Sequence, residues 1–421
     1  MNKIRWSIMQ RMTVCTVLLF AAQALATQSL NGIQLFDAVT VILEQKYINP
    51  RAVDLPSVIA KFRADLNRVC PLASACPTDK GRLVVQQMLA SFDDAHLVLY
   101  NDLFDQSLVG DPNVSGRFGM FLSSSVKALF VSDVYPESPA SRADIRVGDV
   151  VTAINGKAAE SVTLQRLLRQ AELSFSETKI ELMRDGKKFA VTIRATFNRT
   201  LEPQLDQIRD DTMRIRLYAL GQFYMDVLTH RMIEQVNASG AKNLILDLRH
   251  NEGGTSITSM KIAAAFTEPP QRALIDKSGT KYLFKYVSGE VEWRNASNES
   301  DRGVFEGKLE RPSQFKGKLV VLTSNRTYSA GEHLAYMLQQ TGRAVVIGQP
   351  TAGGLDSSAT TEKLNNSEDL LQYGDRRYED LGGTRFPKRV MPDTISKEII
   401  GGFEKNIDDS VQLALNFFDR S

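Results

Sequence analysis

Apolar and polar residues alternate differently in three successive parts of the chain. Between residues 27 and 110, apolar residues recur at the three-to-four-residue spacing of amphipathic helices, as from Ile33 to Leu43 and from Leu83 to Phe92. This spacing predicts a helical N-terminal region that includes the segment ending at His96.

Residues 114–198 have the pattern of a small β-domain. Short runs rich in Val, Ile and Phe are separated by Gly, Pro, Asn and Asp, which favour turns. The predicted strands are Phe118 to Leu122, Ala128 to Val134, Val150 to Ile154, Lys179 to Met183 and Phe189 to Ile193. One amphipathic helix is predicted from Ser161 to Ala171.

Residues 205–421 alternate continuous apolar runs with helical patterns. The runs Asn243 to Leu248, Lys318 to Thr323 and Ala344 to Gly348 indicate strands, and helices are expected over Met225 to Val236, Ile257 to Phe266 and Ala330 to Gln340. Strands that are apolar throughout are typical of parallel sheets covered by helices on both faces, so we predict an α/β core. Residues 280–310 are expected to form a hairpin insertion.

The first 26 residues predict a secretory signal peptide. Lys3, Arg5 and Arg11 precede an apolar run that ends at Ala24-Leu25-Ala26, a small-x-small cleavage pattern. The run is shorter than the ~20 residues needed to span a bilayer. We therefore expect an exported protein, periplasmic or secreted, without a stable membrane anchor.

Removal of this segment changes the charge and cysteine counts. The chain of 421 residues has 51 Lys and Arg against 49 Asp and Glu, a net charge of +2, which does not indicate a nucleic-acid partner. Residues 1–26 hold three basic residues and no acid, so the mature net charge becomes 2 − 3 = −1. Loss of Cys15 leaves Cys70 and Cys76, which can pair in an oxidising compartment and stabilise the fold by roughly 2 kcal/mol.

No pattern in the sequence indicates a metal or a cofactor. The two cysteines lack a neighbouring histidine or second cysteine pair, and no phosphate-binding glycine loop precedes a Lys-Ser or Lys-Thr pair. The oligomeric state is not indicated either.

Three segments carry candidate chemistry. Ser329 lies between a predicted strand and a helix, where free N–H groups favour negative charge, although serine is also a common helix N-cap. Gly253 and Gly254 follow the strand that ends at Asp247 and either expose N–H groups or form a tight turn. His96 could activate a serine, because serine is a weak nucleophile without a base.

The β-domain resembles a PDZ domain. The string from Ser138 to Asp149 and the Asn155-Gly156 turn follow the order of that family, although Asp144 stands where the family usually has Gly. The resemblance implies binding of an extended peptide, by its C-terminal carboxylate, along a groove edge. That edge is expected at Gly119, Met120, Phe121 and Leu122.

The whole order of motifs resembles the tail-specific (C-terminal-processing) serine protease family. The motifs are Asp-Asp-Ala-His96, the PDZ-like domain, Leu-Asp-Leu-Arg-x-Asn-x-Gly-Gly254, Tyr-Ser329-Ala-Gly-Glu, Thr-Ala-Gly-Gly354 and Pro392-Asp393. This resemblance implies a crotonase-like α/β catalytic core that hydrolyses peptide bonds of polypeptide substrates.

The resemblance also implies roles for individual residues. Ser329 matches the nucleophile, and the amides of Ala330, Gly253 and Gly254 match the oxyanion donors. One branch of the family uses a Lys as base, but Gly354 occupies that position here. The sequence therefore resembles the branch of the tricorn core and the retinoid-binding protein repeats, in which a His such as His96 is the base.

The third catalytic member is less clear from the family pattern. The position where the family has a Glu falls on Phe386. The acid is therefore expected at Glu379 or at Asp380, shifted in the loop, with Asp93 or Asp94 beside His96 and the absence of any acid as alternatives. His333, one helical turn after Ser329, is an alternative base, and His250 an alternative substrate contact. His230 is expected to be structural.

Two functions remain open on these grounds. The first is an exported serine endopeptidase that uses Ser329 and His96. The second is a binding protein on the same fold that holds a peptide or an apolar ligand, since fold alone does not decide function.

Overall fold

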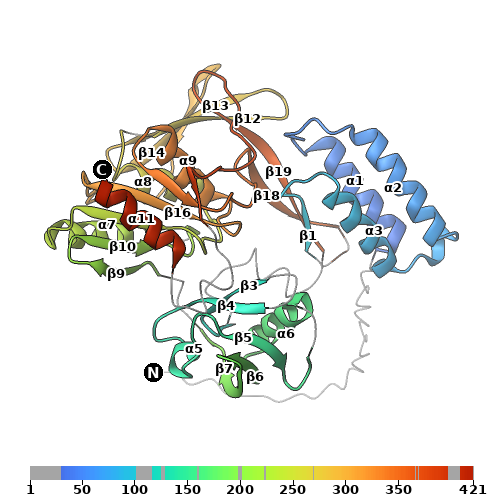
Figure 1. Cartoon of the computed structure of the whole chain (residues 1–421). Coiled ribbons are helices and arrows are strands. Elements are labelled where there is room, and N and C mark those ends of the chain that lie inside the picture. Colours follow the sequence, from blue (N-terminus) through green and yellow to red (C-terminus); the bar gives the residue numbers. More distant parts are fainter. Residues whose placement is uncertain are drawn as a thin grey trace, which may run out of the picture.

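A computed structural model describes residues 30–100, 116–124, 129–158, 161–197, 202–221, 224–268, 270–365, 367, 369–396 and 408–420. The predicted signal peptide, residues 1–26, lies outside them. Figure 1 shows three parts: the helices α1 to α3 (blue, right), a small β-domain below, and a large α/β core that contains the C-terminus.

The N-terminal part is a three-helix unit. Its elements are α1 (Gly32–Gln45), α2 (Leu55–Val69), the 3-10 turn η1 (Ala73–Ala75) and α3 (Thr78–Ala90). A disulfide joins Cys70 to Cys76 across η1, with the two Cα atoms 5.1 Å apart. The helices share an apolar cluster with Leu371 and Tyr373 of the core, and strand β1 (Val98–Tyr100) pairs with the core strand β19 (Leu370–Glu379). The helical unit is therefore fixed to the core directly before and after His96.

The small β-domain is a five-stranded antiparallel sheet in the order β3-β4-β5-β6-β7. Its strands are β3 (Met120–Ser124), β4 (Leu129–Val134), β5 (Val150–Ile154), β6 (Glu177–Arg184) and β7 (Lys187–Arg194). The helices α5 (Pro139–Arg142) and α6 (Ser161–Ser174) cover it, and β2 (Gly116–Arg117) pairs with β8 (Thr196–Phe197). Leu164 and Leu168 of α6 pack on Val131 and Ile180 of the sheet.

The core contains a six-stranded sheet in the order β20-β17-β16-β11-β10-β9. Neighbouring strands are parallel except at the edge strand β9. The strands are β9 (Gln204–Arg209), β10 (Thr212–Arg216), β11 (Asn243–Asp247), β16 (Lys318–Thr323), β17 (Val345–Gly348) and β20 (Thr394–Ile395). The predicted strand from Lys318 to Thr323 and the predicted helix from Ala330 to Gln340 have the boundaries found in the structure.

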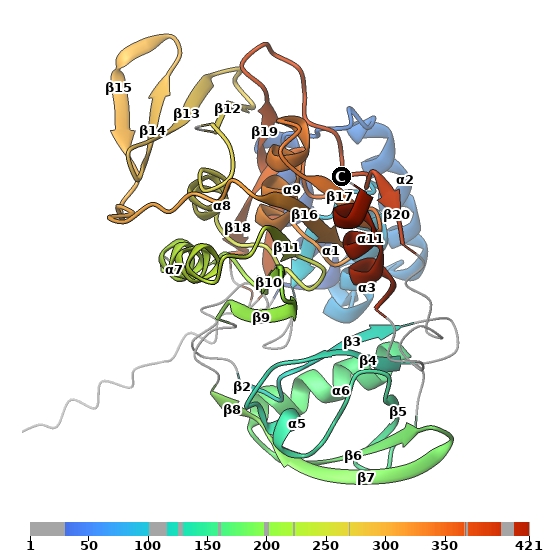
Figure 2. The ribbon, with the colours of Figure 1, turned by 60° about the vertical axis from the view of Figure 1, so that its left-hand side comes forward.

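Helices cover both faces of this sheet (Figure 2). On one face lie α7 (Met225–Ala238), α8 (Ser256–Ala263) and α9 (Ala330–Gln340), whose apolar residues pack on Leu244, Leu246 and Val321. On the other face α11 (Asp409–Arg420) packs on Ile245 and Val320. The fully apolar strands thus face a helix on each side, as the sequence predicts.

A second sheet in the core has the order β1-β19-β12-β13-β14-β15, and β18 also pairs with β19. Its remaining strands are β12 (Gln271–Asp276), β13 (Lys281–Val287), β14 (Glu290–Asn295), β15 (Asn298–Val304) and β18 (Ser357–Lys363). Residues 280–310, predicted as a hairpin insertion, form three strands that extend this sheet. The prediction missed the third strand because Asn298–Val304 is almost entirely polar.

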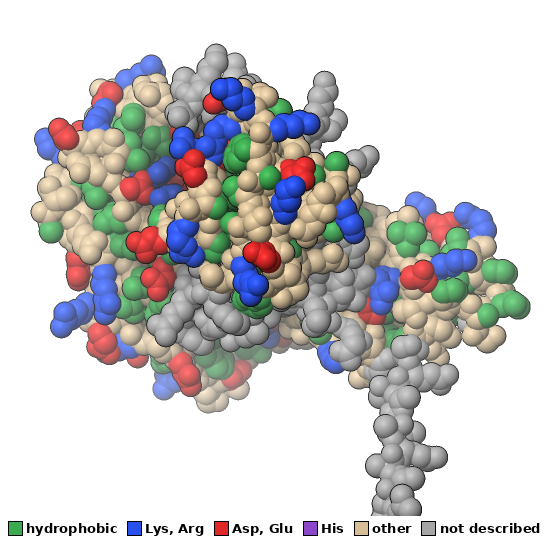
Figure 3. Space-filling model, turned by 90° about the horizontal axis from the view of Figure 1, so that it is seen from below, with side chains coloured by type: hydrophobic (Ala, Val, Ile, Leu, Met, Phe, Trp, Pro, Cys, Tyr) green, Lys and Arg blue, Asp and Glu red, His purple; other side chains and the backbone are tan. Residues whose placement is uncertain are grey.

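Among the described residues, no helix is both long and apolar enough to cross a bilayer. On the face drawn in Figure 3, basic and acidic side chains are interspersed over the surface.

Candidate active site

Ser329 lies between β16 and α9 in a strained backbone conformation. Its φ is 49° and its ψ is −113°, although only glycine adopts positive φ without steric cost. Such a conformation costs roughly 1–3 kcal/mol and persists only where the surroundings determine it.

The buried carboxylate of Glu332 holds Ser329 in this conformation. Its Oε2 accepts hydrogen bonds from the amides of Ser329 (2.8 Å) and Gly354 (2.8 Å). Its Oε1 accepts from the amide of Gly353 (2.9 Å) and the hydroxyl of Thr351 (2.5 Å). Burial raises the pKa of Glu332, while these four hydrogen bonds favour the ionised form and lower it. Glu332 thereby ties the serine turn to the glycine loop 351–354.

His96 and Ser329 are in hydrogen-bonding distance. The His96 Nε2 lies 3.2 Å from the Ser329 Oγ, and the His96 side chain is buried. The backbone amide of His96 donates to Asp94 Oδ1 (2.9 Å), and its ring lies 5.1 Å from that of Tyr328. The structure thus brings together the two residues that the sequence assigns as base and nucleophile.

The other nitrogen of His96 faces a serine hydroxyl. His96 Nδ1 lies 3.1 Å from the Oγ of Ser357, which begins β18 and is buried. If Nδ1–H donates to Ser357, the lone pair of Nε2 is free to accept the Ser329 proton. Sequence reasoning missed Ser357, because no motif marks it and the contact joins residues 261 positions apart.

Glu379, the expected third member, is not brought to His96. Its carboxylate pairs with Arg377 at 2.9 Å, in β19. The three alternatives also lie elsewhere or act indirectly: Asp93 pairs with Lys388, and Asp380 accepts a hydrogen bond from the amide of Thr384. Only Asp94 touches His96, and it does so at the backbone.

A buried polar network supports Asp94 behind His96. Asp94 accepts a hydrogen bond from the hydroxyl of Tyr47 (2.8 Å) and lies 3.8 Å from Arg51, which also pairs with Asp356 at 3.3 Å. Burial raises the pKa of Asp356 to about 7. Burial also lowers the pKa of His96 to about 4, with Asp94 opposing and Arg51 adding to that shift. His96 is therefore neutral at pH 7, the form a general base requires.

Gly354 explains why a lysine cannot share this arrangement. A Cβ atom on Gly354 would lie 3.0 Å from His96 Nε2 and 3.0 Å from Tyr328 Cε2. A lysine side chain that starts there would enter the space of the imidazole.

The glycine turn after β11 lies against Ser329. A Cβ on Gly253 would lie 3.0 Å from the Ser329 Cβ, and Gly253 has a φ of 87°. The Gly253 amide, expected as an oxyanion donor, already donates to Asn251 Oδ1 (3.0 Å). Within the described ranges, the amides of Gly254 and Ala330 have no protein acceptor. The bridge between Gly254 and Leu220 directs the Gly254 N–H away from Leu220.

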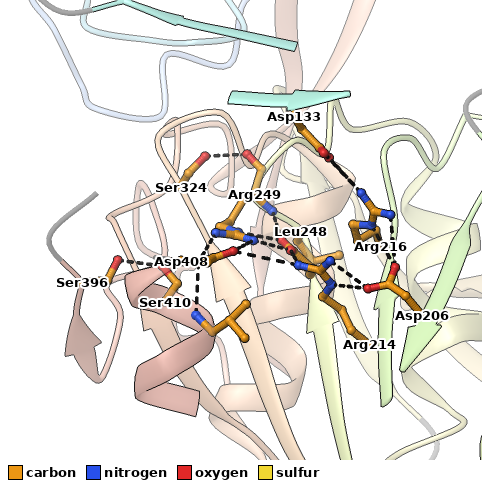
Figure 4. Close-up of polar contacts among 12 residues, drawn as sticks. Asp133, Asp206, Arg214, Arg216, Leu248, Arg249, Ser324, Ser396, Asp408 and Ser410 are labelled. Carbon is orange, nitrogen blue, oxygen red and sulfur yellow. Dashed lines mark hydrogen bonds and ion pairs between the residues drawn. The ribbon is translucent and has the colours of Figure 1, made fainter. Parts of the chain in front are cut away.

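An ion-pair network fixes this glycine turn to the rest of the core (Figure 4). Arg249 pairs with Asp247 at 2.6 Å and, beside α11, with Asp408 at 2.8 Å. The hydroxyl of Ser324 donates to the carbonyl of Arg249, and that of Thr327 donates to the carbonyl of Leu248 (2.8 Å). The loop before Ser329 and the turn before Gly253 are therefore joined directly.

The β-domain contacts the core beside this turn. Phe121 stacks on Tyr218 with ring centroids 4.9 Å apart and lies 5.0 Å from the His250 ring. Asp133 pairs with Arg216 at 3.2 Å, as Figure 4 shows, and accepts a hydrogen bond from the Tyr218 hydroxyl (3.0 Å). His250 is thus a contact between the two domains.

The residues expected to form a peptide groove line a small pocket. Gly119, Met120, Phe121 and Leu122 line about 190 Å³ between β3 and α6. Glu172 of α6 accepts a hydrogen bond from the Phe118 amide (2.8 Å). Arg117 pairs with Glu252, the residue before Gly253, at 3.4 Å.

The remaining histidines lie in the core. His230 is satisfied at both ring nitrogens, by the carbonyl of Lys261 (3.0 Å) and the amide of Ser313 (2.9 Å). His333, the alternative base, packs on Tyr378 with ring centroids 4.1 Å apart, and it is His96 that lies at Ser329.

Comparisons with known proteins agree with this architecture. Residues 211–396 match the family model of peptidase family S41, and residues 130–174 match that of the PDZ domain. The carboxy-terminal processing protease CtpA of Bacillus subtilis is 26% identical over 289 residues, 66% of this chain and 56% of that protein. A carboxyl-terminal-processing protease of Picosynechococcus sp. is 27% identical over 285 residues, 65% of this chain and 63% of that protein. Each match therefore covers less than two thirds of the relative.

Solved structures share the fold. The photosystem II D1 C-terminal processing protease has a TM-score of 0.53 at 17% identity, covering 89% of this chain and 97% of its own. Mature CPAF complexed with lactacystin has a TM-score of 0.54 at 12% identity, covering 94% and 98%.

The position of Glu332 leads to a first prediction. In Glu332→Gln an NH₂ group replaces one carboxylate oxygen and faces two of the four donors. We expect a loss of roughly 1–3 kcal/mol of unfolding free energy, because buried donors lose their acceptor. Displacement of Ser329 should also lower any turnover on the order of 100-fold.

Chemical denaturation and a hydrolysis assay measure these effects. Glu234→Gln, at an exposed position on α7, is the matched control and should change stability by less than about 0.5 kcal/mol. Equal behaviour of the two variants would contradict the role of Glu332.

Proposed function

Because the chain contains a peptidase family S41 domain and a PDZ domain, we propose that it is a serine endopeptidase that cleaves polypeptides near their C-termini. The observation that carries the proposal is the 3.2 Å contact between Ser329 Oγ and His96 Nε2. This is the separation at which a general base takes a proton from its nucleophile.

In the proposed mechanism His96 removes the Ser329 proton as Oγ attacks the scissile carbonyl carbon. The carbonyl oxygen then becomes an oxyanion that the amides of Gly254 and Ala330 stabilise. We assign Gly253 a steric role instead of a donor role, since its amide donates to Asn251. His96 passes the proton to the leaving amine, whose release leaves the acyl group as an ester on Ser329 Oγ. Water then attacks this ester while His96 takes a water proton and returns it to Ser329 Oγ, which releases the carboxylic acid product.

We propose Ser357 in place of Glu379 as the group that orients His96. Its hydroxyl can accept the Nδ1 proton and so hold the tautomer in which Nε2 is basic. Together with Gly354, which leaves room for the imidazole, this supports the Ser–His branch of the family. The alternative function, a binding protein, does not require Ser329 and His96 to be in contact.

For the partner, we propose a peptide C-terminus in the groove at Gly119 to Leu122. The Phe118 amide and Arg117 lie where a carboxylate is expected. A bound peptide carboxylate would have to replace Glu172 at the Phe118 amide.

We also propose that the protein is exported. The N-terminal signal pattern supports this, and so does the Cys70–Cys76 disulfide, because disulfides persist mainly in oxidising compartments.

Peptide hydrolysis tests the proposed enzyme. Wild-type protein should cleave an unstructured peptide, while Ser329→Ala and His96→Ala should lower kcat on the order of 10³–10⁶-fold, because nucleophile and base act as one unit. Ser297→Ala, in an exposed turn, should retain the wild-type rate. Wild-type turnover equal to that of Ser329→Ala would contradict the protease function and favour the binding-protein function.

The pH dependence of kcat/KM tests the orientation of His96. Because its pKa is lowered to about 4 by burial, His96 becomes protonated, and activity falls, only as the pH drops through about 4. Ser357→Asp should move this limb to higher pH, since a carboxylate at Nδ1 stabilises the imidazolium.

Two further variants separate Ser357 from Glu379. Ser357→Ala should reduce kcat by about 10-fold or more, because Nδ1–H loses its acceptor. Glu379→Gln should leave both the rate and the pH profile near wild type. A larger loss in Glu379→Gln than in Ser357→Ala would reverse the assignment.

A further inference from the structure

Arg272 and His333 form a buried polar pair that the proposed mechanism does not use. Arg272, in β12, is 1% exposed, and His333, in α9, is 2% exposed. Three of their nitrogens lack a hydrogen-bond partner among the described residues: Arg272 Nε, Arg272 Nη1 and His333 Nδ1. Because buried polar atoms nearly always have a partner, three unsatisfied atoms in one place require an explanation.

The two side chains belong to one cluster. The Tyr378 ring centroid lies 4.1 Å from that of His333 and 5.2 Å from the Arg272 Cζ. Burial lowers the pKa of His333 well below its usual value, and the charge of Arg272 lowers it further. His333 is therefore neutral, and the positive charge of the cluster belongs to Arg272.

This charge has no anionic partner in the described part of the chain. Burial lowers the pKa of Arg272, and the only opposing influence is Tyr378. The one hydrogen bond of its side chain to a described residue goes from Nη2 to the carbonyl of Ser256. An uncompensated buried cation is strongly unfavourable, and a carboxylate hydrogen-bonded to it would offset part of that penalty.

The cluster lies next to the proposed reaction centre. His333 is one helical turn from Ser329, and Arg272 is anchored to Ser256, two residues after Gly254. The scissile carbonyl would lie between Ser329 and the Gly254 amide. The residue that supplies this carbonyl therefore has its side chain between the segment that begins at Ser329 and the segment that begins at Gly254. The first segment continues to His333, and the second continues to Ser256, which contacts Arg272.

On the basis of the proposed protease function, we propose that Arg272 and His333 form the floor of the subsite for the residue before the cleaved bond, and that this residue is Asp or Glu. Arg272 can donate Nε–H and Nη1–H, and neutral His333 can donate Nδ1–H, to the two carboxylate oxygens. The rings of Tyr378 and Phe386, which both neighbour His333, would contact the methylene groups.

The test uses three peptides that differ only in this residue: Glu, Gln or Met, which have similar size. Their C-termini are amidated so that the PDZ groove is not engaged. We expect wild-type kcat/KM to be on the order of 10–100-fold higher for Glu than for Gln or Met. Mass spectrometry of the products establishes the cleaved bond.

Two variants assign the preference to Arg272. Arg272→Met should abolish the preference for the Glu peptide and cleave the Met peptide fastest. Arg272→Lys, which keeps the positive charge, should retain part of the preference for Glu. Since an unpaired buried cation is removed, Arg272→Met should unfold at the wild-type temperature or above. A purely structural arginine would instead give a destabilised variant with unchanged selectivity.

Binding to Ser329→Ala separates this inference from the proposed function. Tighter binding of the Glu peptide that disappears in Ser329→Ala/Arg272→Met supports the acidic subsite even without turnover. Equal affinity for the three peptides overturns it, and so does efficient cleavage of Gln or Met peptides, although that cleavage would leave the protease function intact.

Discussion

The site depends on one buried carboxylate. Glu332, in the first turn of α9, accepts three hydrogen bonds from the glycine loop 351–354 and one from the strained Ser329. Isolated, an ionised carboxylate in the core would be unfavourable, and only full hydrogen bonding makes it tolerable. The same bonds hold Gly354 beside His96, so the position of the proposed base relative to the proposed nucleophile depends on this carboxylate.

The other groups of the proposed site reach Ser329 from distant parts of the chain. The helical unit delivers His96, because β1 pairs with β19 directly after it. The Arg249 network fixes the turn that carries Gly254 and joins it to the loop before Ser329. Contacts of Phe121 and Asp133 bring the PDZ domain to the same turn. Each segment is thus held by contacts that do not involve substrate, which preorganises the site.

Local patterns in the sequence predict those helices, strands and turns whose form depends on residues close together in the chain. Continuous apolar runs identify the parallel strands, and the serine position follows from the boundary between β16 and α9. The four-residue string from Ser329 to Glu332 matches a capping box. The sequence alone therefore indicates a hydrogen bond from the Ser329 amide to Glu332. The sequence does not indicate the hydrogen bonds of Glu332 to residues 351–354, because they depend on how two distant loops pack.

Ser357 illustrates the limit more clearly. Its contact with His96 arises where β18 pairs with β19, and no spacing along the chain encodes it. The assignment to Glu379 relied on family spacing around Pro392-Asp393, and the structure pairs that residue with Arg377 instead. Likewise, the Gly253-Gly254 pair in the sequence does not indicate that the Gly253 amide donates a hydrogen bond to Asn251.

The central claim is that His96 activates Ser329, and covalent labelling tests it most directly. Folded wild-type protein treated with a fluorophosphonate at pH 7 should be modified at Ser329, as peptide mapping would show. The rate in His96→Ala should be lower on the order of 100-fold or more, because base catalysis supplies 10²–10⁴-fold. Absence of the adduct on Ser329, or equal labelling rates in the two proteins, would contradict the account.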